Sequence, residues 1–229
     1  MFDGLISELD PPANRRGKCD GDKELHFTEA AVMLAYGMHL LATVPQLNSV
    51  ELHPDGEHGK RFEIAKWLSE RGFALTEPQG RTSYCGKYVY GDKSILVTLK
   101  PGKGGVNANT PEGAFTAECK GGFVNTRHPG QVSCLRKGLC EAVGLLMARD
   151  LGGKKIAVVH YTPITLRLAQ KMVPRATAAG IQIDWLTGEG KLSTLERTPG
   201  VRHQARCESA RTQTLSSVPS SYGFTAWTK

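Results

Sequence analysis

The chain has 229 residues, of which 40% are hydrophobic and 22% are charged. This composition is typical of a globular protein with one ordinary domain, and no apolar run is long enough to predict a membrane span. The six scattered cysteines contain no Cys-x-x-Cys pair, which argues against a zinc ribbon and favours a reducing, cytoplasmic setting.

Residues 1–72 are predicted to contain an arm, two helices and the linker between them. Residues 1–24 are polar and broken by Pro and Gly, so they are predicted to form a flexible arm. A helix is predicted over 27–43, with Thr28 as its N-cap and Pro45 after its end. Residues 50–59 have the composition of a turn-rich linker, and a second helix is predicted over 60–71, ending at Gly72.

The chain after residue 86 is predicted to contain three strands in succession and then alternating helices and strands. Strands are predicted over 87–90, 94–100, 114–119, 155–161 and 181–186, and helices over 130–150 and 163–179. The order from residue 59 is therefore α-β-β-β-α-β followed by a further α-β. This order predicts a three-layer α/β/α fold with a mixed central sheet, in one domain over 25–194. Residues 195–229 lose all periodicity and are predicted to be a disordered tail.

The most informative motif is Glu118-Cys-Lys120, at the end of a buried strand and followed by Gly121 and Gly122. Residues two apart in a strand point to the same face, so the carboxylate and the ammonium project together. Such a pair suits metal-assisted attack on a phosphodiester, in which the carboxylate holds a hard cation and the lysine orients water. A second Glu-x-Lys, over 189–191, lies in a polar Gly-rich stretch and is predicted to be a solvated loop.

The ordered set of motifs resembles the PD-(D/E)XK nuclease superfamily, the fold of many restriction endonucleases and of archaeal Holliday junction resolvases. The resemblance covers residues 59–186. It rests on Glu63 in the predicted helix 60–71, Glu118 and Lys120 on the strand, and Gln131 and Arg136 on the following helix. It implies a metal-dependent DNA endonuclease with a restriction-like or repair-like role, and it allows a homodimer.

The resemblance also implies roles for these residues. Glu118 would be a direct ligand of Mg²⁺ or Mn²⁺, Glu63 the helix acid near the metal, Lys120 the catalytic lysine and Gln131 a residue flanking the site. Basic residues near the motif would contact DNA phosphates; these are Lys100, Lys103, Arg127, Arg136 and Lys137. The net charge of +7 is compatible with a polyanionic partner.

One element of the family pattern is missing. The family places an Asp on the strand before Glu-x-Lys, and the aligned position here is Gly105. The nearest side-chain oxygens are the amides of Asn107 and Asn109, which carry no negative charge, and the nearest carboxylates are those of Glu112 and Asp92. Three interpretations stay open: a ligand from elsewhere in the chain such as Asp92, a weak metal site, or a nuclease-dead nucleic-acid-binding module on the same fold.

Two histidine-containing segments have simpler interpretations. The stretch 53–58 contains His53, Asp55, Glu57 and His58, but its Pro and Gly favour an ordinary turn over a metal cluster. His160 lies in an apolar strand and is predicted to be a buried core histidine. Cys119 and Cys140 also lie in apolar segments, and we expect both in the core.

Overall fold

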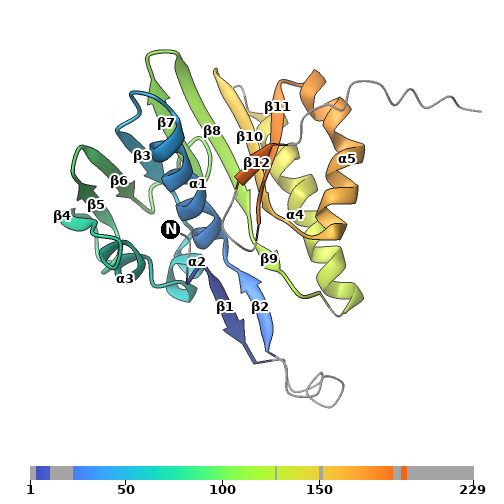
Figure 1. Ribbon diagram of the computed structural model, residues 1–229, viewed down its shortest axis with the longest axis horizontal. Helices are drawn as coiled ribbons and strands as arrows, with labels where there is room; N and C mark the ends of the chain where they lie inside the picture. Colours follow the sequence, from blue (N-terminus) through green and yellow to red (C-terminus); the bar gives the residue numbers. More distant parts are fainter. Residues whose placement is uncertain (1–3, 11–22, 127, 150–151, 188–191, 195–229) are drawn as a thin grey trace, which may run out of the picture. The chain divides into compact units, whose positions relative to one another are not determined.

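The computed structural model describes residues 4–10, 23–126, 128–149, 152–187 and 192–194 (Figure 1). Its centre is a large mixed sheet with helices on both faces, so the predicted α/β class and layered arrangement are confirmed. Within these residues no helix has the length and apolar character needed to cross a membrane. The predicted tail and the second Glu-x-Lys lie outside the described residues.

The strand order of the large sheet is β12-β11-β10-β8-β7-β3-β6-β5-β4. The strand bounds are β3 Ser49–Leu52, β4 Ala74–Pro78, β5 Gly86–Tyr90, β6 Lys93–Val97, β7 Val106–Thr110, β8 Gly113–Lys120, β10 Lys154–His160, β11 Ile181–Leu186 and β12 Leu192–Thr194. Strand β7 pairs antiparallel with both β3 and β8, whereas β8, β10 and β11 run parallel to one another. The motif strand β8 therefore lies inside the sheet.

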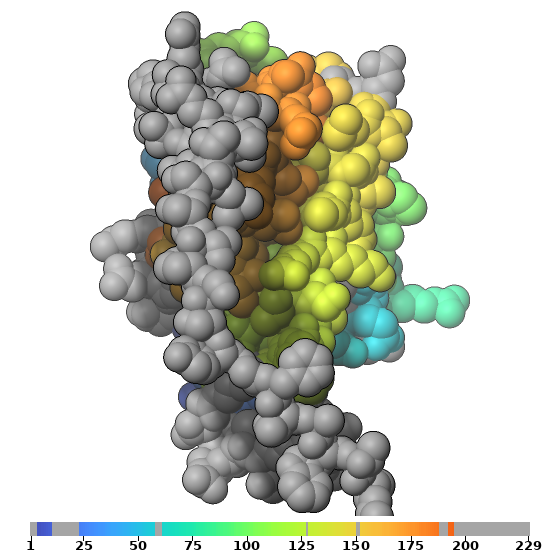
Figure 2. Space-filling view, turned by 90° about the vertical axis from the view of Figure 1, so that its right-hand side faces the viewer, coloured from blue at the N-terminus to red at the C-terminus, as the bar shows by residue number. Residues whose placement is uncertain are grey.

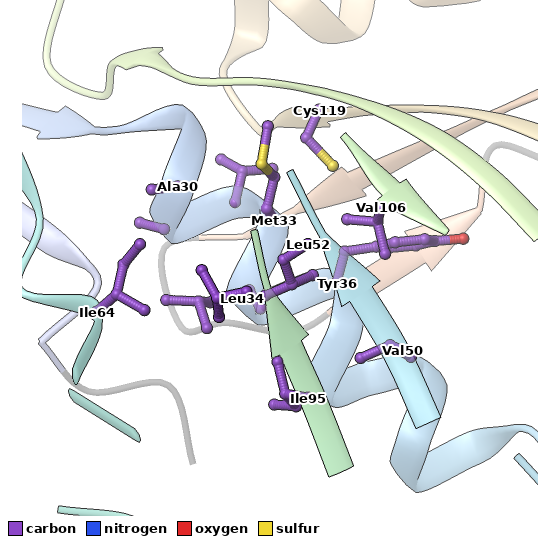
Figure 3. Packing of buried hydrophobic residues seen from close by; sticks show 14 of the residues in the cluster. Ala30, Met33, Leu34, Tyr36, Val50, Leu52, Ile64, Ile95, Val106 and Cys119 are labelled. Atoms are coloured by element: carbon purple, nitrogen blue, oxygen red, sulfur yellow. The ribbon is translucent and has the colours of Figure 1, made fainter. Parts of the chain in front are cut away.

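One face of the sheet packs on helix α1, Glu29–Thr43. Thr28 is its N-cap, as predicted, and its Oγ1 accepts a hydrogen bond from the amide of Ala31. Alternate strand residues such as Val50, Val106 and Cys119 point toward this helix and form the main core with it (Figure 3). The two-residue period of the strands therefore fixes which side chains face α1.

Helices α4, Pro129–Ala148, and α5, Pro163–Ala178, cover the opposite face over β8, β10 and β11. Figure 2 shows these two helices side by side. Ala157 and Val159 of β10 pack against them, while Ile156 and Val158 face α1. Both helices and both parallel strands were predicted within two residues of their ends, but Cys140 is exposed on α4, not buried.

The predicted arm contains structure. Strand β1, Ile6–Leu9, pairs with β2, Glu24–Phe27, and β2 pairs with β9, Gly122–Phe123, in a small second sheet. The prediction of a loose arm is therefore wrong for residues 6–9, because they pair with β2, and β2 is in turn held by β9 just after β8. Residues 11–22 lie outside the described part of the chain.

The predicted helix over 60–71 is also corrected. The chain forms two short helices, α2 Gly56–Arg61 and α3 Ile64–Ser69, which are divided at Phe62 and Glu63. Strands β3, β4 and β7 were not predicted, and β3 falls in the stretch 50–59 that we expected to be a linker. Short strands with polar residues on the open side give a weak sequence signal, so these elements are defined by their neighbours in the sheet.

Candidate functional site

The end of β8 places Glu118 and Lys120 on one face, as the two-residue spacing predicts. Both side chains form ion pairs with residues of the helix α4 side, whereas Ala117 and Cys119 pack in the core with α1. The exposed fraction of Glu118 is only 7%. A carboxylate buried to this degree needs a cationic or hydrogen-bonding partner.

Lys120 is held between two carboxylates. Its Nζ lies 2.9 Å from Oε1 of Glu29, in the first turn of α1, and 2.9 Å from Oε1 of Glu141 on α4. Burial lowers the pKa of Lys120, but the carboxylates of Glu141 and Glu29 outweigh burial and raise it above its ordinary value. The lysine is therefore a fixed cation that joins the two helical layers around the strand end.

Glu118 is paired with Arg149, the C-cap of α4, whose guanidinium also donates to the carbonyl of Lys103. Burial raises the pKa of Glu118, while the guanidinium of Arg149 and the ammonium of Lys120 oppose this rise. One arginine thus connects the buried carboxylate to the loop that precedes β7. Arg149 was not among the predicted residues, and only the tertiary structure brings it here.

The glycines after Lys120 let the strand end approach α1. A Cβ on Gly121 would lie 2.2 Å from the carbonyl oxygen of Phe27 and 2.8 Å from the amide nitrogen of Glu29. No side chain fits at that separation, so glycine is required for this contact. The junction of β2 and α1 is thereby pressed against the end of β8, which brings Glu29 to Lys120.

Gln131 lies at the start of α4 and is buried. Its Oε1 accepts from the amide of His128 in a capping box, and its Nε2 donates to Oε1 of Glu24 at 3.0 Å. The structure therefore shows Gln131 capping a helix and joining it to β2. This arrangement neither requires nor excludes the predicted flanking role.

Two predicted metal ligands lie elsewhere. Glu63 was expected to face the sheet, but its side chain is 78% exposed and pairs with Lys66 one turn along α3. It lines a cavity with Gly4, Phe62 and Trp67, and neither Glu118 nor Lys120 lines that cavity. The helix acid that reaches Lys120 is Glu29, and its sequence signal was its position just after the N-cap Thr28.

Asp92 is the second such residue. It lies in the turn between β5 and β6, 74% exposed, with Oδ2 3.8 Å from Nζ of Lys93. Strands β3 and β7 separate β6 from β8, which corresponds to about 14 Å at the usual strand spacing. The interpretation that Asp92 replaces the missing family Asp is therefore unsupported by this geometry.

The predicted nucleic-acid contacts fall into separate groups. Lys100, Lys103 and Asn107 line one cavity on the sheet, beside β3 and β6. Arg136 and Lys137 are exposed on the outer side of α4, away from that cavity's lining. Arg127 lies outside the described residues. The structure thus brings the two loop lysines together with Asn107, but not with the α4 pair.

The strand end does not fit a metal site as it stands. Among the described residues, no three His, Cys, Asp or Glu side chains gather closely enough to hold a metal ion. Val106, which pairs with Ala117, is the first residue of the β7 ladder, and Gly105 just before it supplies no ligand side chain. The carboxylate of Glu118 is engaged by Arg149.

Comparison of the chain with family models, with curated proteins and with solved structures found no match. The resemblance to the nuclease superfamily therefore stays a prediction from the motifs.

His160 is buried as predicted, and burial lowers its pKa to about 4. Its ring packs beside Gly122, two residues after the end of β8.

Proposed function

We propose that this chain is a nucleic-acid-binding module on a nuclease-like α/β/α domain, and that it does not hydrolyse DNA in its present sequence. The observation that carries this proposal is the pairing of Glu118 with Arg149. A hydrolytic site of this kind needs a second carboxylate to hold Mg²⁺, and the position aligned with the family Asp is Gly105, which has no side chain. The positive net charge and the loop lysines support binding to a polyanion.

The first experiment measures DNA binding by fluorescence anisotropy, with labelled single-stranded and duplex DNA and without divalent metal. Binding is expected to weaken steeply as salt rises, because phosphate contacts release counterions. Lys100→Gln with Lys103→Gln should weaken binding, whereas Lys171→Gln, an exposed lysine on α5, should leave it unchanged. Absence of binding at low salt would overturn the proposed function.

A second experiment restores the missing carboxylate. A Cβ on Gly105 would meet the terminal methyl of Met33 at 2.7 Å, and that flexible end can move aside. Gly105→Asp should therefore be accommodated, with its Cβ pointing toward α1, on the face of the sheet opposite Glu118. Mn²⁺-dependent cleavage by the folded variant would support the alignment with the family. The matched control is Gly104→Asp, because a Cβ there would lie 2.8 Å from the backbone oxygen of Ala117, which cannot move in the same way. A folded but inactive Gly105→Asp would count against the alignment with the family.

Metal-dependent endonuclease activity of the wild type is the second candidate. It is favoured by the placement of Glu118 and Lys120 on one face of the strand end, with the carboxylates of Glu29 and Glu141 on either side of Lys120. Calorimetric titration with Mn²⁺ distinguishes the candidates: binding to the wild type that Glu118→Ala abolishes would support the nuclease and contradict the binding module.

A further inference from the structure

The sheet face opposite α1 is only partly covered by helices. Helices α4 and α5 pack on β8, β10 and β11, at one side of the sheet (Figure 1). Beyond β8, the same face of β7, β3 and β6 carries a row of paired residues, Thr116, Asn107, Glu51 and Leu96. A cavity of about 520 Å³ opens over this row, and the loop with Lys100 and Lys103 forms its rim.

Two buried polar atoms in this cavity have no hydrogen-bond partner among the described residues. They are Nε2 of His53 and Oδ1 of Asn107. The His53 side chain is only 10% exposed, and its Nε2 lies 3.6 Å from Oε2 of Glu51, beyond hydrogen-bond distance. Buried polar atoms normally have hydrogen-bond partners, so two buried atoms without such a partner in one cavity indicate a ligand that hydrogen-bonds to them.

The neighbours of Nε2 of His53 and Oδ1 of Asn107 determine whether each atom donates or accepts a hydrogen bond. Nδ1 of His53 lies 2.8 Å from the carbonyl oxygen of Lys100, and a carbonyl only accepts, so Nδ1 carries the proton. In the neutral ring Nε2 is then an acceptor. Nδ2 of Asn107 donates to the carbonyl of Gly104 at 3.3 Å, which leaves Oδ1 as a second acceptor in the cavity wall. Both unpaired atoms therefore require donors.

We infer that this cavity binds one nucleotide through a base that carries an exocyclic amino group. The amino group would donate to Asn107 and His53, with the Glu51 carboxylate beside them, while Lys100 and Lys103 at the rim would hold the phosphate. The volume is that of a small-molecule pocket and far exceeds the needs of a single ion. This inference rests on the proposed function, since it names the part of a nucleic acid that the domain recognises.

The cavity is linked to the strand-end residues. Arg149 donates to the carbonyl of Lys103 at the rim and pairs with Glu118, and Thr116 lines the cavity two residues before Glu118 on β8. A nucleotide in the cavity would thus lie on the same sheet face as Glu118. Gly102 packs against the edge of the His53 ring, where a Cβ would lie 2.3 Å from Cδ2 and 2.4 Å from Nε2, so this loop shifts when a ligand contacts Nε2.

The test compares two ligands that differ in the amino group alone. Binding of AMP and of purine riboside 5′-monophosphate is measured by calorimetry without divalent metal. AMP should bind the wild type about tenfold more tightly, because the analogue leaves the acceptors unpaired. Asn107→Leu should weaken AMP binding about tenfold and leave the analogue unchanged, so the two ligands become equivalent.

The control variants separate the two ends of the cavity. Lys100→Gln with Lys103→Gln should weaken both ligands alike, and Lys171→Gln should change neither. Equal binding of AMP and its analogue to the wild type, or binding of neither, would overturn the inference. So would Mn²⁺ binding that is lost in Asn107→Leu, because the acceptors would then serve a cation. If the protein binds DNA but does not discriminate AMP from its analogue, the proposed function holds and the nucleotide site is refuted. If it discriminates AMP but does not bind DNA, the proposed function is refuted and the nucleotide site holds.

Discussion

The end of β8 and the cavity over β3, β6 and β7 lie on one face of the same sheet but differ in how their polar groups are satisfied. At the strand end, Glu118 and Lys120 are engaged by Arg149, Glu29 and Glu141. In the cavity, acceptors of His53 and Asn107 are buried and have no hydrogen-bond partner within the described part of the chain. Paired charges stabilise the fold and resist a new ligand, whereas unpaired acceptors gain from one. The comparison therefore predicts that strand-end changes cost stability and cavity changes cost binding.

The largest expected effect comes from closing the space at the strand end. Gly121→Ala should lower the free energy of unfolding by about 3 kcal/mol, because its Cβ would overlap the backbone at Phe27 and force β2 and α1 away from β8. Urea denaturation measures this loss. Gly144→Ala on α4 is the matched control, since a Cβ there meets nothing within 4 Å and should leave stability unchanged or slightly increased. Equal stabilities of the two variants would refute the close approach.

The next effect is a pH dependence that arises from His160. Its pKa is lowered to about 4 in the folded protein, from 6.5, so the folded state keeps the ring neutral while the unfolded state binds a proton. Stability from this group is complete above pH 6.5 and is lost as the pH falls toward 4, by up to about 3 kcal/mol. His160→Gln removes the titrating ring, and urea denaturation across this range should show a flatter profile. An unchanged slope would mean that other groups produce the acid sensitivity.

A smaller loss is expected when the cation between the helices is removed. Lys120→Met removes the ammonium that the carboxylates of Glu29 and Glu141 share and should cost about 2 kcal/mol of stability. The control is Lys66→Met, because Lys66 pairs with Glu63 in an exposed i, i+3 pair that contributes little. If both variants lost the same stability in urea denaturation, the strand-end lysine would be an ordinary surface charge.

The sequence predicted the strand-end pair better than its surroundings. The two-residue spacing was enough to place Glu118 and Lys120 on one face, and long periodic runs predicted α4, β10 and α5. Glu29 was missed because its contact with Lys120 depends on the close packing at Gly121, between segments far apart in the chain. Glu63 was chosen in its place because a continuous helix was expected, and that helix breaks at this residue.

The cavity illustrates the same limit in another way. Asn107 was predicted as a weak metal ligand, and His53 as part of a turn, from their residue types alone. Their unpaired atoms become visible only when β3 and β7 are placed side by side and the carbonyls of Lys100 and Gly104 fix the ring and the amide. Because these bonds come from the backbone of a loop, no residue pattern in the sequence encodes them.

The smallest expected effect on stability separates the two regions most directly. Asn107→Leu exchanges an amide with a buried unpaired oxygen for an apolar side chain of similar size, at the loss of one donor bond to Gly104. These terms oppose each other, so the free energy of unfolding should change by less than about 1 kcal/mol. The same variant is expected to abolish the discrimination between AMP and its analogue. A large loss of stability in urea denaturation would show that Asn107 stabilises the fold. The distinction between strand-end residues that stabilise the fold and cavity residues that bind a ligand would then be refuted.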